Sequence, residues 1–301
     1  MAFRNIIVQN EARLSLKGRL IVVKTAAQEA TLAIEDIDTL LIENRQTTLS
    51  TALMGSLAKS GVALFICDEY HMPCAVLTPY LQHSRQYEVT EKQLALSTPA
   101  KKQLWKQIVV AKIKNQAKTL SLCGRESSAT VLENIAKTVK SGDEGKAEGY
   151  AAARYFPALF GKGFTRGDDE DCRNSWLNYG YAIVRGCVAR TLAVYGFFPL
   201  FGLQHHSTLN QFNLADDFIE PYRQIVDLFT ATYADCDSEL TPEVKNKLVN
   251  LINYDIIIND KRYSLSYAVE MTVQSFSAVV SGKGKSLLLP NLIELKQHTY
   301  E

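Results

Sequence analysis

The stretch Ala12-Arg13-Leu14-Ser15-Leu16-Lys17-Gly18-Arg19-Leu20-Ile21-Val22-Val23 contains two short runs of mainly apolar and β-branched residues, separated by Lys17-Gly18. Runs of this kind are typical of β-strands. A short break that contains glycine suits a hairpin, because glycine adopts the backbone angles that tight turns require. The stretch therefore predicts two neighbouring strands joined by a turn.

The same pattern continues on both sides of this hairpin. Four further runs, at residues 5–8, 31–34, 39–42 and 63–66, are equally short and apolar. One helix is expected at residues 49–60, where Ser50 can cap the first turn and Gly61 can end the last. Strands spaced so closely favour a compact sandwich over alternating β-α-β units.

Beyond Pro99 the pattern becomes helical for nearly the whole remaining chain, with apolar residues such as Leu104, Ile108 and Ala111 at three- and four-residue spacing. Helices are expected at residues 101–122, 129–140, 144–156, 174–195, 216–233, 242–251 and 264–280, with a small hairpin near residues 256–260. We therefore predict an α+β protein. An N-terminal β-sandwich-like domain (residues 1–80) is followed by a linker (81–100) and a larger all-α domain (101–301).

The composition restricts the class of protein. Of 301 residues, 47% are hydrophobic and the net charge is +1, whereas disorder requires low hydrophobicity with high net charge. The six cysteines lack the paired spacing of a zinc site. The chain contains no apolar run of about 18 residues and no secretory signal pattern, so we expect a cytoplasmic protein with no membrane partner.

The charge is distributed unevenly. Residues 81–125 carry nine basic and two acidic residues, whereas residues 126–301 carry 17 basic and 22 acidic residues. No acidic residue occurs between residues 101 and 125, so like charges at four-residue spacing repel one another there. This basic run is either a solvated helix face or a surface that faces a polyanion.

A second cluster combines histidines with acidic residues. His205 and His206 lie shortly before Asp216, Asp217 and Glu220. If a helix begins near Asp216, the carboxylates of Asp217 and Glu220 project from the same face. Acidic residues at a helix start also have a structural explanation, since they cap the helix and complement its dipole. Histidine with carboxylates is nevertheless the ligand set of a divalent cation.

Glu148 is a third candidate. It is the single carboxylate in a stretch of Gly, Ala and aromatic residues, where an unpaired charge is costly to bury. We expect it either to be exposed or to pair with Arg154. Trp105 and Trp176 are interpreted as core residues rather than as platforms for nucleic-acid bases.

Several short motifs occur together in this chain. They are Ala147-Glu148-Gly149, Ala152-Ala153-Arg154-Tyr155-Phe156, Asn178-Tyr179-Gly180-Tyr181-Ala182-Ile183, Gly202-Leu203 with His205-His206, Asn213-Leu214-Ala215-Asp216-Asp217 and Glu220-Pro221-Tyr222-Arg223. This combination resembles the universal CRISPR-associated integrase, the metal-dependent DNase of spacer acquisition, and especially the version found in type II CRISPR systems. The resemblance spans essentially the whole chain.

The resemblance implies a metal site. Members of the family bind Mn²⁺ or Mg²⁺ through residues that fall here on Glu148, His205 and Glu220. His206 is an alternative to His205, and Asp217 is a candidate for a supporting ligand or hydrogen-bond acceptor. Many relatives have an aspartate where this chain has Glu220.

The resemblance also implies a reaction. In integration, a 3′-hydroxyl of the incoming DNA attacks a phosphodiester of the CRISPR repeat, and a bound cation can assist so that no protein nucleophile is required. DNA phosphates would be positioned by basic residues. The candidates are Lys101, Lys102, Lys106, Lys112, Lys114, Lys118 and Arg166.

The implied partners are double-stranded DNA and further protein subunits. The family forms homodimers to which the β domain, residues 1–80, would contribute, assembled around a dimer of a second, small CRISPR-associated protein. Type II systems would add a further acquisition subunit and the RNA-guided effector nuclease. Two alternatives share these features: a non-catalytic DNA-binding scaffold, and a general nuclease that acts on branched DNA.

Overall fold

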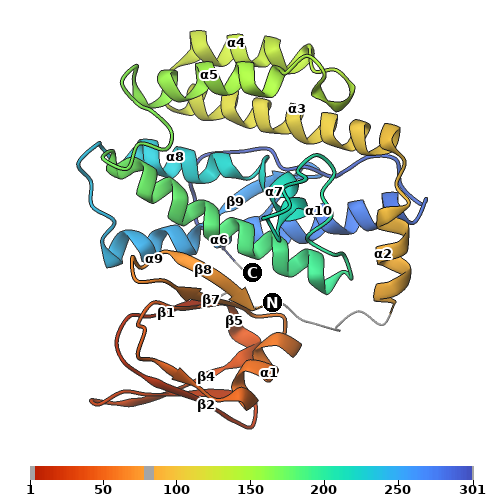
Figure 1. Ribbon diagram of the computed structural model, residues 1–301. Helices are drawn as coiled ribbons and strands as arrows, with labels where there is room; N and C mark the ends of the chain where they lie inside the picture. Colours follow the sequence, from red (N-terminus) through yellow and green to blue (C-terminus); the bar gives the residue numbers. More distant parts are fainter. Residues whose placement is uncertain (1–3, 78–84, 300–301) are drawn as a thin grey trace.

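The computed structural model describes residues 4–77 and 85–299. Two β-sheets form one end of the molecule, and layers of helices lie above them (Figure 1). The α+β class and the order of its two parts are thus confirmed. The predicted domain boundary at residue 80, and residues 81–84 of the predicted linker, lie outside the described residues.

The predicted hairpin forms the centre of the outer sheet. Strands β2 (Arg13–Lys17) and β3 (Leu20–Lys24) pair antiparallel, and Gly18 occupies their turn with φ 62°. Strand β4 (Glu29–Ala33) pairs antiparallel with β3, while β6 (Thr48–Leu49) pairs parallel with β2. A positive φ favours glycine, which explains why the turn is at Lys17-Gly18.

The inner sheet corrects one expectation. It consists of β1 (Arg4–Val8), β5 (Ile37–Ile42), β7 (Ala63–Cys67) and β8 (Pro73–Leu77), and both β1 and β7 run parallel to β5. Helix α1 (Thr51–Lys59), capped by Ser50, connects β5 to β7. A β-α-β unit is therefore present within the two-sheet domain, which the close spacing of the strands did not predict. Both faces of its central strands are covered, because Leu40 and Leu64 join the core between the sheets whereas Leu41 and Phe65 join the helical core.

The described residues from 85 to 280 are mostly helical, with one hairpin. The helices are α2 (Gln86–Leu94), α3 (Thr98–Leu122), α4 (Glu126–Lys137), α5 (Ala147–Phe160), α6 (Cys172–Val194), α7 (Asn213–Ile219), α8 (Arg223–Tyr233), α9 (Pro242–Asn250) and α10 (Leu265–Val280). Strands β9 (Asp255–Ile258) and β10 (Lys261–Ser264) form the predicted hairpin. No helix in the described part of the chain is long and apolar enough to cross a membrane.

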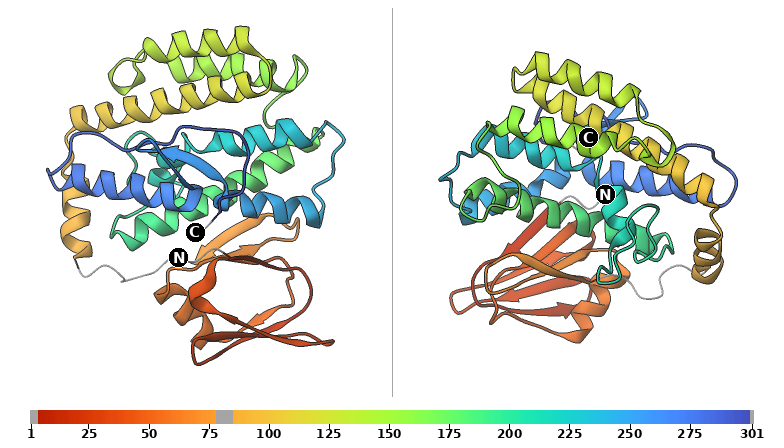
Figure 2. Two further views of the ribbon diagram at one scale, coloured as in Figure 1. Left: turned by 180° about the vertical axis from the view of Figure 1, so that it is seen from behind. Right: turned by 45° about the horizontal axis from the view of Figure 1, so that its top comes forward.

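Helix α2 occupies nearly half of the predicted linker and was not expected. It lies at one edge of the helical part in both views of Figure 2. The side-chain amide of Gln93 donates hydrogen bonds to the carbonyls of Phe198 and Phe201, which fixes α2 against the loop after α6. The nine residues of α2 include few apolar side chains, so the sequence pattern did not predict a helix there. The hydrogen bonds of Gln93 hold this helix in place instead.

Helix α3 is the central element of the helical part. It packs against α4 and α5 on one side and against α8 on the other (Figure 1). Its buried residues therefore occupy more than one face, among them Trp105, Ile108 and Ile113. Trp105 and Trp176 are both buried, which confirms their interpretation as core residues.

The predicted helix 216–233 is two helices. Helix α7 ends at Ile219, and α8 begins at Arg223. Pro221 lies between them, and proline cannot donate the backbone hydrogen bond of a continuous helix. Glu220 consequently lies at the C-terminal end of α7 instead of the first turn of a longer helix.

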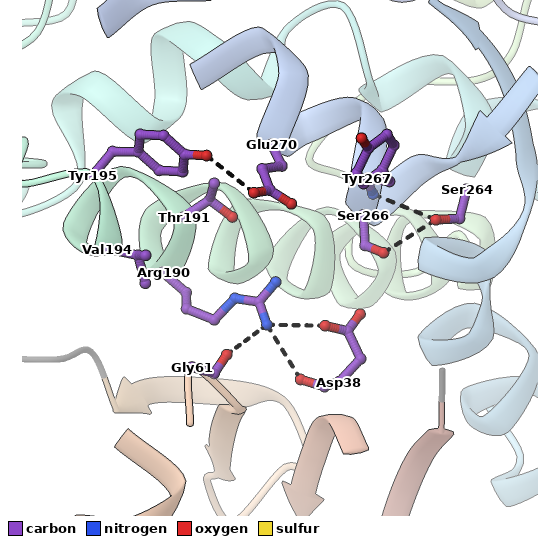
Figure 3. A pocket seen from close by; sticks show the side chains of 10 residues that line it. All are labelled: Asp38, Gly61, Arg190, Thr191, Val194, Tyr195, Ser264, Ser266, Tyr267 and Glu270. Atoms are coloured by element: carbon purple, nitrogen blue, oxygen red, sulfur yellow. Dashed lines mark hydrogen bonds and ion pairs between the residues drawn. The ribbon is translucent and has the colours of Figure 1, made fainter. Parts of the chain in front are cut away.

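Two buried ion pairs join the sheets to the helices. Arg190 on α6 contacts the Asp38 carboxylate at 2.9 Å and the Gly61 carbonyl at 2.7 Å, beside a cavity of about 230 Å³ (Figure 3). Lys245 on α9 lies 2.5 Å from the carboxylate of Glu43. These contacts fix the inner sheet against α6 and α9.

Candidate active site

Three distant parts of the chain meet beside α3. Glu148 lies in the first turn of α5, Glu220 at the end of α7, and His205 in the loop between α6 and α7. Asp143 fixes the start of α5, since its carboxylate accepts hydrogen bonds from the backbone N–H groups of Ala147 (2.8 Å) and Glu148 (3.0 Å). The α5 terminus thereby presents Glu148 toward α3.

Lys112 of α3 joins the two carboxylates. Its Nζ lies 2.6 Å from Oε1 of Glu148 and 2.6 Å from Oε2 of Glu220. The side chains are 12%, 27% and 5% exposed, respectively, so the ammonium is enclosed. Burial by itself lowers the pKa of Lys112, but the charges of Glu220 and Glu148 outweigh burial and raise it.

This contact changes two expectations. The structure places Lys112 between carboxylates, although the sequence grouped it with lysines for DNA. Glu148 pairs with Lys112 and not with Arg154, whose guanidinium instead lies 3.4 Å from the centre of the Tyr150 ring. Helical spacing explains the first difference, because Lys112 emerges on the inner side of α3.

Glu220 is held between two cations. In addition to Lys112, the guanidinium of Arg223 lies 3.3 Å from its Oε1. Burial raises the pKa of Glu220, but Lys112 and Arg223 outweigh burial and lower it. Its Oε2 is buried and has the ion pair with Lys112 but no hydrogen bond of good geometry. Glu220 is therefore a buried anion whose charge is balanced by two side chains.

Asp217 organises the loop that carries His205. Its buried Oδ1 lies 2.8 Å from Nδ1 of His205, and its Oδ2 accepts hydrogen bonds from the backbone N–H groups of Leu203 and Gln204. The hydrogen bond to Asp217 raises the pKa of His205 despite partial burial. Since Asp217 holds Nδ1, the imidazole offers its other nitrogen, Nε2, to a ligand.

The surroundings of His205 favour it over His206. The His205 and Trp105 rings lie perpendicular to each other at a centroid distance of 5.8 Å, which fixes the imidazole against α3. His206 is exposed. Gly202 makes the tight loop possible, since a Cβ at this position would lie 2.3 Å from the His205 carbonyl and 2.8 Å from Asp217 Oδ2.

The remaining lysines of α3 do not form one stripe. Lys101 lies eleven residues, or about three turns, before Lys112 and so lies on the same side of the helix. Lys102 pairs with Glu144 at 2.9 Å, and Lys106 is half-buried. Lys114 and Lys118 are exposed on another side.

Arg166 lies in an arginine-rich pocket instead. Its guanidinium donates hydrogen bonds of 2.6 Å to the amide oxygens of Asn174 and Asn178. Arg185 and Arg223 line the same pocket of about 210 Å³. The sequence did not single out Arg185, because Arg166 in the loop before α6, Arg185 on α6 and Arg223 on α8 come together only on folding.

The donor chemistry fits a hard divalent cation. Two carboxylates and an imidazole are suitable ligands for Mg²⁺ or Mn²⁺, and the buried Glu220 Oε2 has the Lys112 ion pair but no well-aligned hydrogen bond. As the side chains stand, no group of three His, Cys, Asp or Glu residues within 4–77 and 85–299 is close enough to hold a metal ion. The position between Glu148 and Glu220 is already cationic, since Lys112 Nζ occupies it.

Similar folds occur in known structures. A casposase bound to integration product has the same fold, with a TM-score of 0.77 over 95% of this chain and 92% of that chain at 19% identity. A Cas1 protein from Thermotoga maritima gives a TM-score of 0.70 over 94% and 98% at 14% identity. At these identities the likeness concerns the fold alone.

The sequence comparisons are more specific. The family described as CRISPR associated protein Cas1 matches residues 6–236. The CRISPR-associated endonuclease Cas1 of Neisseria meningitidis serogroup C (strain 8013) is 43% identical over 100% of both chains. The corresponding protein of Francisella tularensis subsp. novicida is 25% identical over 92% of this chain and 96% of that protein. The chain belongs to the Cas1 family.

Proposed function

We propose that this protein is a metal-dependent DNA endonuclease and integrase that inserts new spacer DNA into the CRISPR array of a type II system. The observation that carries the proposal is that Glu148 and Glu220 meet at the Lys112 ammonium, while Asp217, three residues before Glu220, holds His205. The similar protein from Neisseria is named an endonuclease, and a similar fold occurs in a casposase bound to integration product.

Glu148, His205 and Glu220 would hold Mg²⁺ or Mn²⁺, with Asp217 in a supporting role. When bound, such a cation polarises the phosphodiester and activates the attacking 3′-hydroxyl or water. Asp217 fixes the imidazole, and Arg223 balances the buried charge of Glu220. Arg166 and Arg185 border Arg223, so they are placed to position DNA phosphates without reading sequence.

The proposed partners follow from the family. Double-stranded DNA is the substrate, and the β domain (residues 1–80) contributes to a homodimer. Similar structures include a Cas6-RT-Cas1–Cas2 complex and a Cas1–DNA complex, which supports assembly around a small second CRISPR-associated protein. The type II acquisition subunit, the RNA-guided effector and a cytoplasmic location belong to the same proposal.

Strand transfer of a short duplex into a repeat-bearing plasmid tests the function. With Mg²⁺ or Mn²⁺ present, His205→Ala and Glu220→Gln should each reduce transfer by at least about a hundredfold, because each removes one proposed ligand. Glu133→Gln, at an exposed position of α4, is the matched control and should keep full transfer. Full activity in both site variants would reject the metal site. DNA binding without any transfer by the wild type would favour a scaffold.

A further inference from the structure

Lys112 is the unusual member of the candidate site. Its ammonium lies equally close to two carboxylates that come from different helices. A Lys side chain is a compact charge on a flexible stem, so it can stand between two anions. The position that it occupies is the one where two acidic ligands would share a cation.

The charges around Lys112 balance without any metal. Glu148 and Glu220 contribute two negative charges, and Lys112 and Arg223 contribute two positive charges. Two carboxylates close together in a partly buried site repel each other strongly unless a cation lies between them. Arg223 contacts Glu220 at 3.3 Å, and Lys112 is the cation that contacts both acids.

We propose that Lys112 is the built-in counter-ion of this site: its ammonium holds Glu148 and Glu220 together in the metal-free protein and competes with the divalent cation for them. Lys112 is thus a positioning residue, and it acts through the two carboxylates. This inference rests on the proposed metal-dependent function. It adds that the metal-free fold is stable because an internal cation replaces the metal, at the cost of weaker metal binding.

The substitution Lys112→Met separates this role from simple packing. Methionine keeps the apolar stem but removes the charge, so the two acids lose their shared partner. The metal-free melting temperature, measured in EDTA, should fall by at least about 6 °C, as expected for a broken buried ion pair. Mn²⁺ affinity, measured by calorimetry and by electron paramagnetic resonance, should rise by about tenfold or more, because the competitor is gone.

Lys112→Met should thus lower the metal-free melting temperature but raise Mn²⁺ affinity, a combination that a purely structural lysine would not produce. Lys137→Met, at an exposed position of α4, is the control and should change neither quantity. Equal or weaker Mn²⁺ binding by Lys112→Met, while the wild type binds the ion, would overturn the proposal. In that case Glu220→Gln would still abolish binding, so the metal-dependent function would stand.

If no protein in this set binds Mn²⁺, both the function and the inference fail. If Lys112→Met does not fold, the comparison moves to the Glu148→Gln background, where only one buried acid remains. In the Glu148→Gln background the remaining acid, Glu220, keeps Arg223 as a partner when Lys112 is replaced by Met. In the Glu220→Gln background the remaining acid, Glu148, does not have Arg223 as a partner. Lys112→Met should therefore lower the melting temperature about half as much in the first background as in the second. A loss in only one of the two backgrounds would contradict a shared counter-ion, because Lys112 would then stabilise only one acid.

Discussion

At the residue scale, Gly202 decides where His205 lies. The Gly202 backbone passes so close to the His205 carbonyl and to Asp217 that only hydrogen fits in place of a side chain. Asp217 then uses both carboxylate oxygens on the same short loop. The position of the imidazole is therefore set by the tight backbone at Gly202 together with the Asp217 carboxylate of α7.

Gly202→Ala should displace His205. The added methyl would overlap two oxygens, so we expect a loss of stability of about 1–3 kcal/mol and at least a tenfold loss of strand transfer. Gly163→Ala is the matched control, because a Cβ there meets nothing within 4 Å. Thermal unfolding and the plasmid assay measure both effects. Normal transfer by Gly202→Ala would show that the loop can relax.

A second residue links stability to pH. Asp227 is buried and accepts hydrogen bonds from the hydroxyls of Tyr155, at 2.8 Å, and Tyr181. Burial raises the pKa of Asp227 to about 6, although the two tyrosine hydrogen bonds oppose the rise. The native state therefore binds a proton between about pH 4 and pH 6 that the unfolded chain does not bind.

Stability from this group accordingly falls as the pH rises through that window, by about 2–3 kcal/mol in total. Asp227→Asn does not titrate, so its stability relative to the wild type should increase from pH 4 to pH 6 and then stay level. Urea unfolding at a series of pH values measures this difference. A difference that is constant with pH would show that Asp227 is not protonated in the native state.

At the element scale, α6 owes its position to two glycines. A Cβ at Gly186 would lie 2.0 Å from the Phe65 ring of β7, and one at Gly180 would lie 2.4 Å from Val226 of α8. The helix can thus approach the inner sheet on one side and α8 on the other. Glycine is unfavourable inside helices, so these positions exchange local helix stability for close packing.

Alanine substitutions at helical glycines should therefore change the free energy of unfolding in opposite directions, depending on the space around each glycine. Gly186→Ala should destabilise the protein by about 1–3 kcal/mol, because α6 must move away from Phe65. Gly55→Ala on α1, where a Cβ would meet nothing within 4 Å, should stabilise it by about 0.5–1 kcal/mol. Urea unfolding at pH 7 distinguishes the two. Stabilisation by both would mean that Phe65 repacks freely.

At the scale of the whole molecule, the sheets and helices are joined by buried charge as well as by apolar contacts. Besides Lys245, Glu43 is contacted by the side chains of Gln9 and His71, at 3.2 Å each. All of these groups lie at the seam between the inner sheet and α9. The packing of the inner sheet against α9 thus depends on a few polar side chains that must lie within contact distance of Glu43.

Lys245→Met should weaken this seam. It leaves the buried Glu43 carboxylate without its closest cation, for which we expect a loss of about 3–5 kcal/mol. Lys247→Met, two residues away, breaks only an exposed pair with Glu243 and should leave the melting temperature unchanged. Thermal unfolding compares them. Equal melting temperatures would contradict a structural role for the buried pair.

Short-range patterns explain how much of the fold could be predicted. The turn at Gly18, the cap at Ser50 and most helix ranges follow from neighbouring residues, and all are confirmed. The parallel pairing of β5 with β7, the helix α2 and the interruption at Pro221 were missed or misread. The first two depend on contacts between segments far apart in the chain, which periodicity does not encode. The interruption has a local cause, since Pro221 cannot continue the helix.

Local sequence patterns predicted the order of strands and helices, and the motifs around Glu148, His205 and Glu220 indicated the family. The contacts of those residues became apparent only in the folded chain: Lys112 between two acids, Asp217 behind the imidazole, and three arginines around one pocket. The difference between the two kinds of feature is separation along the chain. Turns, caps and helix periods depend on residues within a few positions, whereas ion pairs between buried groups form only after folding brings remote segments within a few ångströms.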